Sequence, residues 1–200
     1  MKKLLILLLL LPSLAWGQDY ARMNPYILGG GASAAAACAT GTMDSQSHNV
    51  GGTSTATGTL RGQSFKLSAT GYIYSIQLRF YNIGGTKSDD YVLCLDNAAN
   101  MGSSGTCSDA IVCASKTVSF GASGSEWHEF VFQDTTHQFL ADTTYYMALR
   151  ATDTQELGWI TTTDSSYAHG TEYSTTATDC DLTGHDDSGV DCVFRVYLCD

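Results

Sequence analysis

Residues 72–82 read YIYSIQLRFYN and carry the clearest secondary-structure signal in the sequence. Their apolar side chains alternate with polar ones: the apolar set is Ile76, Leu78 and Phe80, and the polar set is Ser75, Gln77 and Arg79. Alternation with a period of two, rich in aromatic and β-branched residues, is typical of a strand with one buried face. The stretch therefore predicts a half-buried β-strand against which similar strands pack.

Strand patterns recur with short gaps on both sides of this stretch. They cover residues 60–67, 90–96, 110–118, 126–132, 143–151, 157–162 and 191–199, with a short one at Glu172 and Tyr173. Polar turns separate them, helical periodicity is missing, and both prolines (Pro12 and Pro25) precede them. The sequence therefore predicts an all-β fold, an antiparallel β-sandwich of the jelly-roll-like kind.

The N-terminus predicts export. Two lysines precede an apolar run at residues 4–11, and small residues follow at Ala15 and Gly17. This order is typical of a secretory signal peptide, and the run is shorter than the roughly 20 apolar residues that span a membrane. We expect cleavage before Gln18, which makes residues 1–17 a signal peptide. The protein is then secreted or at the cell surface, without a membrane span.

The mature chain divides into two parts by composition. Residues 18–59 are poor in charge and rich in Gly, Ala, Ser and Thr, and they lack an amphipathic stripe. Glycines flank their alanine run, which argues against a long helix. We expect a mostly extended N-terminal arm, the segment through which self-association would occur, followed by the β-sandwich domain at residues 60–200.

The charge balance excludes two classes of partner. The chain has a formal net charge of −10, which becomes −12 when Lys2 and Lys3 leave with the signal peptide. An acidic surface repels nucleic acid and anionic membranes, so neither is expected as a partner. Such a surface suits neutral polymers, cations or a salty medium, so an extracellular glycan or another surface polymer is compatible with it.

Seven cysteines in an exported chain indicate disulfides rather than thiolate metal sites. Cys180 and Cys192 bracket an acidic loop, and a bond between them would close a short ring. Cys38 and Cys199 would tie the N-terminal arm to the last strand. An odd count leaves one thiol free or paired between chains.

The remaining three cysteines, Cys94, Cys107 and Cys113, compete for one bond. If the flanking strands form a hairpin centred between Ser103 and Ser104, Cys94 lies directly opposite Cys113. Opposite residues of an antiparallel pair are close enough for a disulfide. The spacing alone does not decide the connectivity.

Short motifs follow one another in a recognisable order. They are RGQSF at 61–65, YSIQL at 74–78, WHEFVF at 127–132, LADTTYY at 140–146, GW at 158–159, YAHGTEY at 167–173 and FRV at 194–196. This order resembles the β-sandwich modules of secreted and cell-surface bacterial proteins, including the choice-of-anchor type, and is similar to modules of phage fibre-like proteins. The resemblance covers residues 60–198 and implies a non-enzymatic surface or binding module, akin in some cases to carbohydrate-binding domains. The cysteines depart from the usual pattern and indicate additional cross-links.

Aromatic residues punctuate a polar stretch near the C-terminal end. Trp159, Tyr167 and Tyr173 occur there, with Asp164 and His169 nearby. Exposed rings with polar neighbours suit stacking against sugars, so these five residues are the candidate ligand-binding set. The alternative places Trp159 and Tyr173 in the core and leaves only Tyr167 exposed.

The acidic loop near the C-terminus is a candidate calcium site. Asp179, Asp181 and Thr183 alternate before a glycine, and Asp187 follows. Such oxygen ligands suit Ca²⁺, although Val190 stands where a bidentate glutamate would be expected. The alternative is a solvated acidic turn. Apart from this structural calcium, no cofactor is expected.

The sequence shows no catalytic motif; a Gly-x-Ser-x-Gly elbow, for example, does not occur. The first hypothesis for function is therefore an exported, non-catalytic module that binds a surface polymer, carbohydrate above all. The second is a structural component of a cell-surface or virion-like assembly. The third is a hydrolase of extracellular polymers, because triads and carboxylate pairs assembled across loops leave no local signature.

Overall fold

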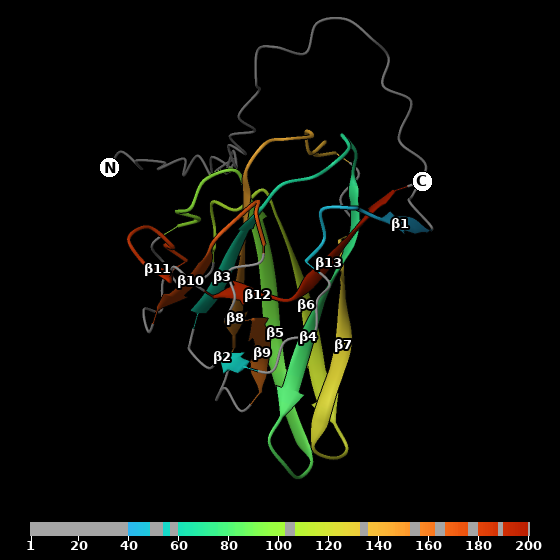
Figure 1. Ribbon diagram of the computed structural model, residues 1–200, viewed down its shortest axis with the longest axis vertical. Helices are drawn as coiled ribbons and strands as arrows, with labels where there is room; N and C mark the ends of the chain where they lie inside the picture. The colour runs from blue at the N-terminus through green and yellow to red at the C-terminus, as the bar shows by residue number, and fades with distance from the viewer. Residues whose placement is uncertain are drawn as a thin grey trace, which may run out of the picture. The chain divides into compact units, whose positions relative to one another are not determined.

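The computed structural model describes residues 40–48, 54–56, 60–102, 107–132, 136–152, 157–162, 167–175, 180–187 and 190–199 (Figure 1). Every regular element in these ranges is a β-strand. Within the same ranges no helix is long and apolar enough to cross a membrane. The predicted signal peptide, residues 1–17, lies outside the described residues.

The strands form two antiparallel sheets, which we call sheet A and sheet B. Sheet A has the order β1 (Gly41–Met43), β13 (Phe194–Cys199), β4 (Ile73–Asn82), β9 (Gly158–Thr162) and β12 (Asp191–Cys192). Two further strands join this sheet: β2 (Ser54–Ala56) pairs with β9, and β7 (Gly124–Val131) pairs with β4. Sheet B has the order β11 (Asp186–Asp187), β10 (Glu172–Thr175), β3 (Leu60–Phe65), β8 (Tyr145–Ala151), β5 (Lys87–Asp96) and β6 (Val112–Phe120).

The two sheets pack face to face, which confirms the predicted all-β sandwich. Strand β4 contributes Ile76, Leu78 and Phe80 to the core between them, and each of these side chains is fully buried, as the alternation predicted. Sheet B supplies facing residues such as Phe65 and Met147. Because inward side chains of both sheets interdigitate, the hydrophobic effect holds the sandwich together.

The sandwich begins earlier in the chain than predicted. Strands β1 and β2 come from the segment expected to be an extended arm, yet β1 pairs with β13 and β2 pairs with β9. The predicted boundary at residue 60 therefore lies too late. Each of these strands has only three residues, too few for a period-two pattern to be visible in the sequence. Of the predicted arm, residues 18–39, 49–53 and 57–59 lie outside the described residues.

The hairpin prediction for Cys94 and Cys113 is confirmed. Strands β5 and β6 pair antiparallel with Cys94 directly opposite Cys113, and the two residues form a disulfide. Cys199 is also disulfide-bonded, but Cys38, its predicted partner, lies outside the described residues.

The predicted bond between Cys180 and Cys192 is wrong. Cys180 pairs with Cys107 instead, and Cys192 is a buried free thiol. The cause is the placement of the two residues in the sandwich. Cys180 packs with a small cluster that includes Leu60 and Cys94 of sheet B, whereas Cys192 belongs to β12 of sheet A and packs in the main core. Burial raises the pKa of the Cys192 thiol well above its ordinary value, so the group stays protonated.

Candidate ligand-binding site

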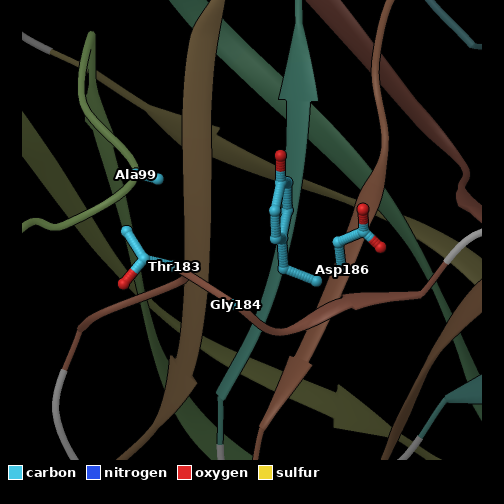
Figure 2. A pocket seen from close by; sticks show the side chains of 5 residues that line it. Ala99, Thr183, Gly184 and Asp186 are labelled. Carbon is cyan, nitrogen blue, oxygen red and sulfur yellow. The ribbon is translucent and has the colours of Figure 1, made fainter.

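A hollow opens beside the short strands at one edge of sheet B. We call it the Tyr173 hollow, after the aromatic residue that lines it; the lining residues are Ala99, Tyr173, Thr183, Gly184 and Asp186. In Figure 2, Ala99 and Thr183 lie on one side of the hollow and Asp186 lies on the other. Its volume of about 470 Å³ falls within the range of roughly 300–1,000 Å³ that is usual for small-ligand sites.

The pairing of β10 with β11 places an aromatic ring beside a carboxylate. Tyr173 and Asp186 are directly opposite each other in this pair, so their side chains leave the same face of the sheet. The Tyr173 ring also packs against the ring of Tyr146, with 5.9 Å between the centroids. Burial raises the pKa of Tyr173, and a hydrogen bond with Ser64 acts in the opposite direction. The hydroxyl is therefore protonated at neutral pH and able to donate a hydrogen bond.

Two loops that pair with each other form the wall of the hollow. We call these two loops, residues 97–102 and 180–185, the cap. The Leu182 N–H donates to the Ala99 carbonyl (2.9 Å), and the Met101 N–H donates to the Cys180 carbonyl (2.9 Å). The disulfide between Cys107 and Cys180 fastens the same region. A wall cross-linked in this way is preorganised, which reduces the entropy that a ligand must offset on binding.

The cap rests on a second, smaller hydrophobic cluster on the outer face of sheet B. Its buried members are Leu60, Cys94, Met101, Cys107, Ala148, Cys180 and Leu182. Gly62 makes the close approach possible, because a Cβ atom there would lie only 2.6 Å from a methyl carbon of Leu182. Because β3 has no side chain at this position, the cap packs directly on the sheet.

The turn that leads into β11 is shaped by one carboxylate and one glycine. Asp181 Oδ1 accepts hydrogen bonds from the Thr183 backbone N–H (2.9 Å) and hydroxyl (2.6 Å), and its Oδ2 accepts one from Asn100 Nδ2 (3.1 Å). Gly184 has a φ of +73°, a left-handed conformation that favours glycine. The two hydrogen bonds from Thr183 stabilise the ionised carboxylate of Asp181, so the pKa of Asp181 lies below its ordinary value.

We predict a pH dependence of this turn. Because the pKa of Asp181 is lower in the folded protein than in the unfolded chain, its contribution to stability is complete above the unfolded value of about 3.9. The contribution is lost as the pH falls through the folded-state pKa. An NMR titration of the Asp181 carboxyl carbon measures this pKa. In Thr183→Ala, which removes the hydroxyl bond, we expect it to rise towards the ordinary value; equal titration curves for the two proteins would contradict the assignment.

The calcium site remains a prediction. Asp179 lies outside the described residues, and only the backbone of Asp187 is described. Among the described residues no group of three or more His, Cys, Asp or Glu could hold a metal ion. The Asp181 titration, repeated with millimolar Ca²⁺ and with Mg²⁺, tests the proposal: calcium binding would lower the pKa of Asp181 further and raise the melting temperature, with the larger effect for Ca²⁺.

The structure separates the candidate aromatic residues. Trp159 is 1% exposed and its Nε1 donates to the Val193 carbonyl at 2.9 Å, so it belongs to the core. Tyr167 is only 7% exposed, which contradicts both interpretations that left it open to solvent. His169 is exposed next to Tyr167, with ring centroids 5.8 Å apart. Asp164 lies outside the described residues. Of the four described candidates, only Tyr173 lines the hollow described above.

The sequence did not single out two of the hollow's residues, Ala99 and Asp186, and it noted Gly184 only as the glycine of the candidate calcium loop. Asp186 belongs to the acidic loop, but its position opposite Tyr173 depends on the pairing of a two-residue strand. Tyr173 and Thr183 had been assigned to separate candidate sites, one for sugar and one for calcium. The fold brings them into a single site.

Comparison with known proteins adds no family assignment. No protein-family model matches the sequence, and no curated protein is significantly similar to it. The resemblance to choice-of-anchor and phage fibre-like modules therefore stays a prediction. The function has to be argued from the site itself.

Proposed function

We propose that this protein is an exported, non-catalytic β-sandwich module that binds an extracellular glycan at the Tyr173 hollow. The observation that carries the proposal is the convergence of an aromatic ring, a carboxylate and a hydroxyl in one cross-linked concavity. Sugar sites combine these elements, because the ring packs against the C–H face of a pyranose while polar groups bind its hydroxyls.

The polar groups of the hollow are of a kind that binds sugar hydroxyls. The exposed Asp186 carboxylate accepts hydrogen bonds. The Thr183 hydroxyl donates a hydrogen bond to Asp181 Oδ1, which leaves its oxygen lone pairs to accept a bond from the ligand. Two acceptors beside a ring favour a neutral ligand rich in hydroxyl donors over an anionic one.

Export is supported by the cross-links. Two disulfides lie in the described part of the chain, and Cys199 forms another. Disulfides persist in oxidising environments and are rare in the cytosol. This agrees with the signal peptide predicted for residues 1–17.

Glycan binding is tested by substituting the ring. We expect Tyr173→Ala to weaken binding to any neutral glycan identified on an array by about tenfold, because a stacked ring contributes on the order of 1 kcal/mol beyond its buried area. Tyr173→Phe, which keeps the ring, should retain most of the affinity. Isothermal titration calorimetry measures both.

The matched control is Tyr72→Ala, since Tyr72 is another partly exposed tyrosine and precedes β4 of sheet A. Its binding should equal that of the unsubstituted protein. An array without any bound glycan, or equal losses for Tyr72→Ala and Tyr173→Ala, would overturn the proposal.

A further inference from the structure

The outer face of sheet A carries a second concentration of recognition groups. Strands β13, β4 and β7 lie side by side there (Figure 1). Gln77 is opposite both Arg195 and Glu129, and Arg79 is opposite Trp127. Residues opposite one another point to the same face, so these side chains form one surface. All of them are partly exposed to solvent.

An aromatic ring and a guanidinium group are held together in this surface. The Arg195 guanidinium carbon lies 3.9 Å from the centroid of the Trp127 ring, although β13 and β7 are separated by β4. A cation–π contact of this length fixes both side chains. The indole offers apolar area and the guanidinium offers N–H groups without much further loss of rotamer freedom.

Two further contacts arrange the polar groups around this pair. Arg79 Nη2 donates to Ser125 Oγ at 3.0 Å, and the Tyr197 hydroxyl donates to Gln77 Oε1 at 3.3 Å. The guanidinium of Arg79 is thus oriented along β7, on the same face as Trp127.

The charge of this face differs in sign from that of the whole chain. Two guanidinium groups, Arg79 and Arg195, accompany one carboxylate, Glu129, whereas the chain as a whole carries a formal charge of −10. Glu129 accepts a 2.6 Å hydrogen bond from the buried Ser75 hydroxyl. At physiological ionic strength charges are screened beyond about 8 Å, so the charges close to a bound group act on it most strongly.

We propose that this face binds an acidic glycan, a polymer whose pyranose units carry carboxylate groups. The pyranose ring would pack on the part of the Trp127 side chain that remains exposed beside Arg195, the carboxylate would take N–H donors from Arg79, and Gln77 and Tyr197 would bind ring hydroxyls. This site is separate from the Tyr173 hollow, which lies on sheet B and is lined by acceptors. The test of this proposal is therefore independent of the test of the neutral-glycan site.

The experiment compares binding of the purified protein to polygalacturonate and to dextran by affinity electrophoresis. We expect the polygalacturonate affinity to fall about tenfold or more in Arg79→Gln, because a charge-assisted hydrogen bond is lost. A similar loss is expected in Trp127→Ala. Lys66→Gln removes the same charge from a residue that follows β3 in sheet B and should bind like the unsubstituted protein.

Three results separate the possible outcomes. Affinity for polygalacturonate that falls with rising salt, and survives Tyr173→Ala, supports the proposal. Absence of binding to polygalacturonate by the unsubstituted protein overturns it. Equal effects of Arg79→Gln and Lys66→Gln overturn it as well, since binding would then follow net charge alone. Unchanged melting temperatures of the variants show that each is folded.

Discussion

Replacing Arg61 by methionine is expected to lower the free energy of unfolding by about 3–5 kcal/mol, because it leaves a buried carboxylate without its cation. Arg61 Nη1 lies 2.7 Å from Glu172 Oε1, and the Glu172 side chain is completely buried. The pair joins β3 to β10, the strand that carries Tyr173. Loss of the cation therefore destabilises the edge of sheet B that forms the hollow.

Urea denaturation measures this change. The double variant Arg61→Met, Glu172→Leu should be more stable than Arg61→Met alone, because it removes the uncompensated charge as well. Arg79→Met is the matched control: Arg79 bonds to Ser125 at a partly exposed position, and we expect a change of less than about 1 kcal/mol. Equal stabilities of Arg61→Met and Arg79→Met would contradict the role assigned to the buried pair.

Removal of the Cys107–Cys180 disulfide is the second change with a large expected effect. The two residues are 73 positions apart, and the chain-entropy relation gives about 4 kcal/mol for a loop of that length. In Cys107→Ser, Cys180→Ser the cap also loses its cross-link. We therefore expect a lower melting temperature together with weaker glycan binding at the Tyr173 hollow.

The disulfide between Cys94 and Cys113 provides the comparison. It spans 19 positions and joins two strands that are already paired, so its removal should cost about 3 kcal/mol and leave the hollow intact. Thermal melts and calorimetric titrations of both double variants test the difference. A Cys107→Ser, Cys180→Ser protein with unchanged melting temperature and affinity would show that the cap does not depend on this bond.

Local pattern was sufficient to predict most of the sandwich. The alternation in residues 72–82 indicated which side chains of β4 face the core, because strand periodicity is a property of consecutive residues. The Cys94–Cys113 pairing was one of the possibilities that the sequence offered, because strands that neighbour each other in the chain often pair and this pairing places the two cysteines opposite each other. Both predictions depend only on residues close together in the chain.

The candidate site depended on contacts that the sequence does not encode locally. Cys180 and Cys192 are near each other in the chain, yet one belongs to the cap and the other to β12. Trp159 and Tyr167 stand in a polar stretch, but the fold buries both of them in the main core. Periodicity tells which side chains share a face of a strand; it does not tell which strand lies next to that face or what covers it. The pattern of consecutive residues was thus enough to identify most strands and the inward face of β4, whereas the make-up of the Tyr173 hollow depended on the fold. Its contacts join the pairing of the two short strands β10 and β11 with the packing of the 97–102 loop, about 80 positions earlier in the chain, and neither leaves a local pattern in the sequence.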